Sequence, residues 1–233
     1  MNKLKSLNLR NYYFECAMIL KNSILRGTIL YASDMYYNLK ESEMRQIERI
    51  EEEYLRKVMR TTRGCPITQL YLESGEIPAR FEIQKMRCLY LKNILSQDEN
   101  NLLYKFFMLQ LESKSRGDWA TTVLKDLKEL KIKETFEEIK LMSKKQFSNI
   151  LKSRIRENAL TYLVGKQKSK GKEIMYNEIK MAEYVLPDAN LTISQKQKMF
   201  AVRNRMTEML ENFPGKDLNE YCICGQKETM IHI

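Results

Sequence analysis

The residues best suited to chemistry are metal-ligand types near the end of the chain. Cys222 and Cys224 are separated by one residue, and His232 stands seven positions after Gly225, which directly follows the second cysteine. Thiolates and a histidine nitrogen are the ligands that zinc prefers, but a structural zinc site takes four of them. Only three are present, so two interpretations stay open: an incomplete zinc site, or two chance cysteines in a terminal tail.

Catalysis by other groups is not supported by the residue types available. His232 is the single histidine, so it is the only residue that could be the base of a Ser–His or Cys–His nucleophilic site. Such a site is therefore very improbable. A two-metal polymerase site needs carboxylates that converge on the ions, and palm-type polymerases supply an adjacent Asp-Asp pair. No two aspartates are adjacent among Asp34, Asp98, Asp118, Asp126, Asp188 and Asp217. We therefore predict no catalytic residue, and no enzyme activity for the chain as given.

Basic side chains are the second feature, because the net charge of +10 is concentrated in two clusters. The first has a single acid, Glu157, among Lys144, Lys145, Lys152, Arg154, Arg156, Lys166, Lys168, Lys170 and Lys172. The second is free of acids and consists of Lys196, Lys198, Arg203 and Arg205. Such local excess attracts polyanions and releases their counterions. A solvated face that only keeps the protein in solution is the alternative.

The elements that position these groups are predicted to be helices. Gly (8) and Pro (4) are scarce, and apolar residues recur at spacings of three and four. We expect Ser42, Asp118 and Ser194 to be N-caps, and Gly75 to be a C-cap. The expected helices span 10–33, 42–61, 66–72, 78–95, 102–112, a segment from Trp119, 134–142, 144–164, 172–185 and 194–213. The predicted fold is all-α, a multi-helix bundle or array with a short irregular C-terminal tail.

Breaks in the pattern suggest how the chain is divided. We expect a helical region over 1–113, a helical linker region over 114–164, a basic helical region over 165–213 and the Cys/His tail over 214–233. The stretch from Gly165 to Lys172 fails the phosphate-loop pattern, since Glu173 stands where Ser or Thr would bind magnesium. We interpret it as a flexible basic linker.

The N-terminal sequence and the cysteines predict the cellular compartment. The start of the chain has no apolar signal region, and no apolar run is long enough to cross a bilayer. The five cysteines are scattered and odd in number. We therefore expect reduced thiols, an intracellular location in the cytoplasm, the nucleus or both, and no membrane partner.

Several longer motifs follow one another along the chain. Residues 23–33 read SILRGTILYAS and residues 70–78 read LYLESGEIP. Residues 194–206 read SQKQKMFAVRNRM, and the sequence around Cys222, Cys224 and His232 follows. In this order the motifs resemble the region that follows the polymerase domain in LINE-type reverse transcriptases, from retroelements without long terminal repeats. In that family a helix with this pattern leads to a cysteine–histidine knuckle with one further cysteine.

The resemblance implies a thumb and post-thumb region that grips RNA or DNA and works with the palm and fingers of the intact polymerase. We expect truncation at both ends, with the polymerase carboxylates before Met1 and the last knuckle ligand beyond Ile233. The predicted function is therefore non-catalytic binding of nucleic-acid backbone by the two basic clusters. A helical interaction or scaffold protein, with no nucleic-acid role, is the alternative.

Overall fold

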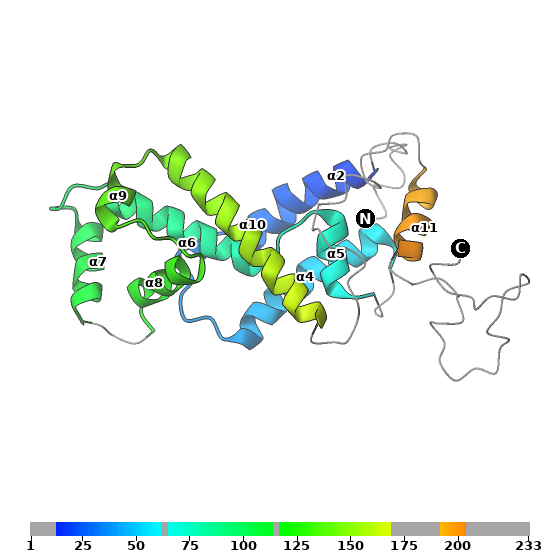
Figure 1. Cartoon of the computed structure of the whole chain (residues 1–233), viewed down its shortest axis with the longest axis horizontal. Helices are drawn as coiled ribbons and strands as arrows, with labels where there is room; N and C mark the ends of the chain where they lie inside the picture. Colours follow the sequence, from blue (N-terminus) through cyan, green and yellow to red (C-terminus); the bar gives the residue numbers. More distant parts are fainter. Residues whose placement is uncertain (1–12, 62–64, 114–116, 169–191, 204–233) are drawn as a thin grey trace, which may run out of the picture. The chain divides into compact units, whose positions relative to one another are not determined.

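The fold was analysed in a computed structural model that describes residues 13–61, 65–113, 117–168 and 192–203. Within these ranges the chain is helical and contains no strand, which confirms the all-α prediction (Figure 1). None of the helices described there is long and apolar enough to cross a membrane. The helices are α2 (Tyr13–Leu20), the π-helix η1 (Lys21–Leu25), α3 (Arg26–Ile29), the 3-10 helix η2 (Ser33–Met35), α4 (Glu41–Met59), α5 (Ile67–Ser74), α6 (Ala79–Leu95), α7 (Leu102–Ser113), α8 (Trp119–Glu129), α9 (Phe136–Leu141), α10 (Lys144–Lys168) and α11 (Ile193–Arg203).

Local signals placed several helix ends correctly. The Asp118 carboxylate accepts a hydrogen bond of 2.7 Å from the backbone N–H of Thr121, and α8 begins at the next residue. Gly75 ends α5 with a φ of 71°, a left-handed conformation that costs glycine little. Pro78 is the N-cap residue of α6, so a proline marks the start of this helix as expected.

Two predicted caps were wrong, for the same physical reason. Ser42 lies inside α4, because the Glu43 carboxylate accepts a hydrogen bond of 2.8 Å from the backbone N–H of Lys40. Ser194 lies inside α11, where Thr192 and Gln195 bond reciprocally, at 2.8 and 3.3 Å. In both helices a Glu or Gln at the third helical position accepts from the backbone N–H of the residue just before the helix. The helix therefore begins one residue earlier than the predicted serine cap.

Two further predictions need correction or lie outside the described residues. The predicted helix over 10–33 is α2, η1 and α3, which end at Ile29. The flexible linker predicted from Gly165 is helical as far as Lys168, since α10 passes through Gly165. The predicted helix over 172–185 and the tail over 214–233 lie outside the described residues.

The chain divides into two compact units, each made of segments that are distant in sequence. Unit 1 comprises residues 1–21, 52–76 and 178–233, and unit 2 comprises residues 22–51 and 77–177. Helix α4 therefore contributes its first half to unit 2 and its second half to unit 1.

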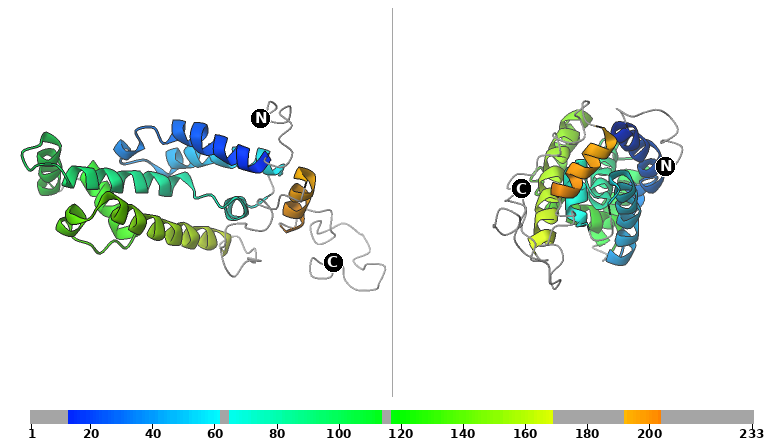
Figure 2. Two further views of the ribbon diagram at one scale, coloured as in Figure 1. Left: turned by 90° about the horizontal axis from the view of Figure 1, so that it is seen from above. Right: turned by 90° about the vertical axis from the view of Figure 1, so that its right-hand side faces the viewer.

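Unit 2 is built around α6, which packs against η2, α7, α8, α9 and α10. Figure 2 shows α10 running alongside α6. The core between these helices is a continuous apolar cluster that includes Leu91, Phe107, Trp119, Leu127 and Phe147. Two of these rings, Phe107 and Trp119, meet edge to face with centroids 5.9 Å apart, an arrangement that aromatic pairs favour.

A buried ion pair joins α6 to α8 inside unit 2. Arg87 donates to both carboxylate oxygens of Asp126, at 2.6 and 2.9 Å, and also to the carbonyl oxygen of Tyr36 at 3.0 Å. Burial raises the pKa of Asp126 above its ordinary value even though the Arg87 guanidinium opposes that shift. The Trp119 indole N–H donates to the carbonyl oxygen of Asp34 at 2.8 Å, so the segment around η2 is tied to both helices.

Hydrogen bonds in unit 1 join α4 to α2, to Cys65 just before α5, and to α11. The Tyr54 hydroxyl donates to the carbonyl oxygen of Ala17 at 2.6 Å, and the Arg56 guanidinium donates to that of Cys65 at 2.8 Å. The Gln197 amide donates to the carbonyl oxygen of Val58 at 3.1 Å. Each bond connects segments that the sequence separates.

Replacing Arg87 with Met is expected to lower the free energy of unfolding by about 3–5 kcal/mol at neutral pH, because Asp126 would lose its buried partner. The loss should shrink as the pH falls. A buried carboxyl with a raised pKa binds its proton more readily in the folded state than in the unfolded state. The free energy of unfolding is therefore not lowered by this group at low pH, and it is lowered more as the pH rises and the carboxyl must ionise. Urea unfolding at several pH values, followed by circular dichroism, measures this. In the control Arg87→Met/Asp126→Asn the pH dependence should disappear, and its persistence would contradict the assignment.

A second prediction separates the two faces of α10. Leu151 is fully buried in the core of unit 2, whereas its neighbour Lys152 is exposed. Leu151→Ala should lower the free energy of unfolding by about 2–5 kcal/mol, through lost burial and the cavity left behind. Lys152→Gln should change it by less than about 0.5 kcal/mol. Equal effects of the two substitutions, measured by urea unfolding, would mean that α10 is not packed as described.

Candidate nucleic-acid interface

Helix α10 carries an apolar row and a basic row on different faces. Phe147, Leu151, Ile155, Ala159 and Leu163 recur every fourth residue and are buried. Residues four apart lie above one another on a helix surface, so this spacing makes a continuous ridge. All but Leu163 belong to the core cluster of unit 2, and the ridge therefore fixes which side of α10 faces outward.

The adjacent ridge of α10 presents cations to solvent. Lys144, Lys152 and Arg156 have the same fourfold spacing and are all exposed. Lys145, beside the first of them, is exposed as well. Among the described residues, none of these four side chains forms an ion pair with a carboxylate. We call these four residues the α10 basic face. The twelve helical steps from Lys144 to Arg156 extend over about 18 Å.

Two other predicted contact residues on α10 are engaged within the helix. Arg154 is half-buried and donates to the Glu157 carboxylate at 3.4 Å. Lys166 is also half-buried, donates to the Tyr162 hydroxyl at 2.8 Å, and lies 4.8 Å from the centre of that ring. These internal contacts compete with a phosphate for the same donors, so we place both residues outside the α10 basic face.

Two members of the second predicted cluster, Lys196 and Lys198, differ in their exposure to solvent. Lys196 is only 3% exposed and Lys198, two positions later, is exposed. The next residue, Gln197, is also buried, and it donates to the carbonyl oxygen of Val58 in α4 at 3.1 Å. The side chains of Lys168 and Arg203, and the whole of Lys170, Lys172 and Arg205, lie outside what the structure describes.

Basic residues on the neighbouring helix were missed by the count along the sequence. Asn158 of α10 donates to the carbonyl oxygen of Glu129 at 2.7 Å, which brings the end of α8 beside α10. Lys128 and Lys131 are exposed at this end of α8. Two acids of the same stretch hide their excess in a sequence count, but Asp126 is buried against Arg87 and Glu129 lies 3.8 Å from Lys125. Discounting acids that have such partners would have revealed this second group.

A groove of about 740 Å³ lies in unit 2, with α10 forming one wall through Asn158, Thr161 and Tyr162. Arg80 crosses it, donating at 2.8 Å to Glu41 and at 3.0 Å to Glu48, and stacking 4.6 Å from the Tyr162 ring centre. Each charged side chain that lines the groove has a partner of opposite sign: Glu41 with Arg80, Arg87 with Asp126, and Lys125 with Glu129. Groups so paired have structural roles.

Other residues with chemical potential are also accounted for by structure. Asp118 caps α8, and Asp126 is the partner of Arg87. Burial raises the pKa of the Cys88 thiol, which keeps it protonated as a small apolar group in the core. The described residues contain no cluster of three or more potential metal ligands. Cys222, Cys224 and His232 lie outside them.

The arrangement is suited to a particular kind of contact. Flexible ammonium and guanidinium groups in a row, with little acid beside them, can bind the phosphates of a polyanion without reading bases. Comparison with protein-family models, with curated proteins and with solved structures found no match to this chain.

Proposed function

We propose that this chain binds the backbone of RNA or DNA without catalysis, and that the α10 basic face carries the binding. The observation behind the proposal is the row of exposed cations on the ridge of α10 next to its buried ridge, none of which forms an ion pair with a described carboxylate. The resemblance to the region after the polymerase domain of LINE-type reverse transcriptases agrees with this role. There, template or target strands would be held for RNA-directed DNA synthesis by the palm and fingers.

The spacing of the row suits a phosphate chain. About 18 Å of helix spans roughly five phosphates of one strand, at 3.4 Å of rise each. Only one acid, Glu157, occurs in α10, and Arg154 lies within 3.4 Å of it. The field above this face is therefore positive along its length, which favours association with a polyanion and gives no preference for sequence.

The side chains on this face are also free to adapt. They are exposed lysines and an arginine on a rigid helix that the core holds in place. A rigid support with flexible donors fits strands of varying geometry, as sequence-indifferent binders require. The exposed Lys128 and Lys131, beside α10, widen the same positive region.

Binding to labelled single-stranded DNA, duplex DNA and RNA, measured by fluorescence anisotropy over a range of salt, tests the proposal. Each cation that binds a phosphate contributes about −0.7 to −0.9 to the slope of log K against log[salt], so three of the four cations on this face contribute about −2 to −3. Replacing Lys145, Lys152 and Arg156 with Gln should flatten the observed slope by about that amount, for all sequences alike.

The matched control removes the same charge elsewhere, by replacing exposed Lys40, Lys57 and Arg60 with Gln. The control should keep most of the slope, because net charge alone does not locate a binding surface. If both triple variants lose affinity equally, the α10 basic face is not the binding surface. If the unaltered chain fails to bind at low salt, the alternative, a helical interaction or scaffold protein without a nucleic-acid role, is favoured.

We also propose that the tail binds zinc incompletely, through Cys222, Cys224 and His232, with water, another chain or a further residue as fourth ligand. Titration of the reduced protein with Co²⁺ should produce the absorption of thiolate-to-cobalt charge transfer, and Zn²⁺ should displace it. Cys222→Ser should abolish that absorption, whereas Cys88→Ser, in the buried core, should leave it unchanged. Absence of the band in the unaltered protein would leave the two cysteines as a chance pair.

A further inference from the structure

Helix α7 is apolar on almost every side. Its sequence, LLYKFFMLQLES, has charges only at Lys105 and Glu112. One face is buried, since Phe107 is 1% exposed and its ring lies 5.9 Å from that of Trp119 and 5.8 Å from that of Phe136. A helix that is hydrophobic all round is normally covered on all sides. The described residues of unit 2 leave the opposite face of α7 exposed.

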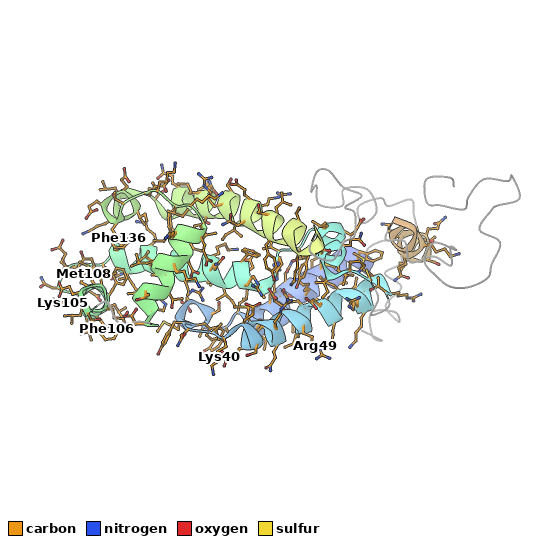
Figure 3. The ribbon with its side chains drawn as sticks, turned by 60° about the horizontal axis from the view of Figure 1, so that its bottom comes forward. Lys40, Arg49, Lys105, Phe106, Met108 and Phe136 are labelled. Atoms are coloured by element: carbon orange, nitrogen blue, oxygen red, sulfur yellow. The ribbon has the colours of Figure 1, made fainter. Side chains whose placement is uncertain are left out.

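That opposite face carries large apolar side chains at helical spacing. Leu102, Phe106 and Leu109 are 79%, 59% and 61% exposed, and they stand four and three residues apart. Leu103, beside them, is 49% exposed. Figure 3 labels Lys105 and Phe106 on α7, at one end of unit 2. A contiguous exposed apolar patch of this kind marks an interaction surface rather than ordinary protein surface.

The charges beside the patch indicate what covers it. In heptad terms Leu102 and Leu109 are d positions, Phe106 and Ser113 are a positions, and Lys105 and Glu112 are both g positions. Two copies of this helix that pair antiparallel place Phe106 against Leu109 of the partner subunit. The g positions of antiparallel helices flank one another, so Lys105 lies beside Glu112 of the partner subunit, and the reverse pair forms by symmetry.

We propose that α7 is a self-association surface, through which two copies of this chain form an antiparallel helix pair. The two-fold symmetry makes the same patch complementary to itself, in apolar contact and in charge. Self-pairing turns the two charges that flank the stripe into two ion pairs. The interface is short, so the dimer is expected to be weak and concentration-dependent.

Other occupants fit this face less well. A helix that lies on an anionic membrane surface has an excess of Lys and Arg on its polar face, whereas α7 has one Lys and one Glu. A nucleic-acid strand would need cations or stacking groups along the stripe, and Lys105 is the one cation of this helix. A second copy of α7 gives both Lys105 and Glu112 a partner of opposite charge.

Sedimentation equilibrium of the full chain at rising concentration tests the proposal. Phe106→Gln should abolish the concentration-dependent dimer, and far-UV circular dichroism should show unchanged helix content because the side chain is exposed. Lys105→Glu or Glu112→Lys alone turns both ion pairs into like-charge contacts, and each should weaken dimerisation about tenfold. These outcomes do not depend on nucleic-acid binding, which uses another helix.

A charge exchange gives the decisive readout. The double variant Lys105→Glu/Glu112→Lys should restore dimerisation, and an equimolar mixture of the two single variants should form a heterodimer. Recovery of this kind requires that the two positions meet across the interface. A chain that stays monomeric at every concentration, or single variants with unchanged dimerisation, would overturn the proposal. Sedimentation of the chain with anionic vesicles, lost in Phe106→Gln, would assign the face to a membrane surface instead.

Discussion

The buried pair of Arg87 and Asp126 is the constraint on which unit 2 depends. Two charges out of water are tolerated only when they meet with good geometry, and here they meet at 2.6 and 2.9 Å. This condition admits one register of α8 on α6. A third bond from Arg87, to the carbonyl oxygen of Tyr36, brings the segment near η2 into the same arrangement. The apolar contacts around the pair give stability, while the pair specifies how the helices align.

The orientation of α10 follows from that arrangement. Its ridge from Phe147 to Ala159 joins the core that α6 and α8 define, so the cations of the α10 basic face have only the solvent side available. The same burial changes the effective charge of the surface. Asp126 is neutralised in the interior, and Lys196 is withdrawn from solvent. The positive surface of unit 2 is therefore set by which charges the core removes as well as by the number of lysines.

Unit 2 consequently has two outward helices of opposite character. The α10 basic face suits a polyanion, and the exposed stripe of α7, from Leu102 to Leu109, suits another apolar helix. Pairing through α7 would join two α10 basic faces in one assembly. A polyanion long enough to reach both would then bind with a higher effective concentration at the second face. In this way a weak dimer and a sequence-indifferent interface reinforce one another.

Local sequence patterns determined the helical class and most helix positions, because apolar spacing, Pro78, Gly75 and Asp118 act over a few residues. They did not determine which lysines are exposed. Lys196 is buried on a helix whose Gln197 bonds to Val58, 139 positions away, and the charge of Asp126 is paired with Arg87, 39 positions away. The open face of α7 was equally hidden, because a fully apolar helix predicts burial on all sides. The local charge and the spacing of apolar residues follow from the sequence alone. Which residues distant in sequence meet is decided only when the helices pack.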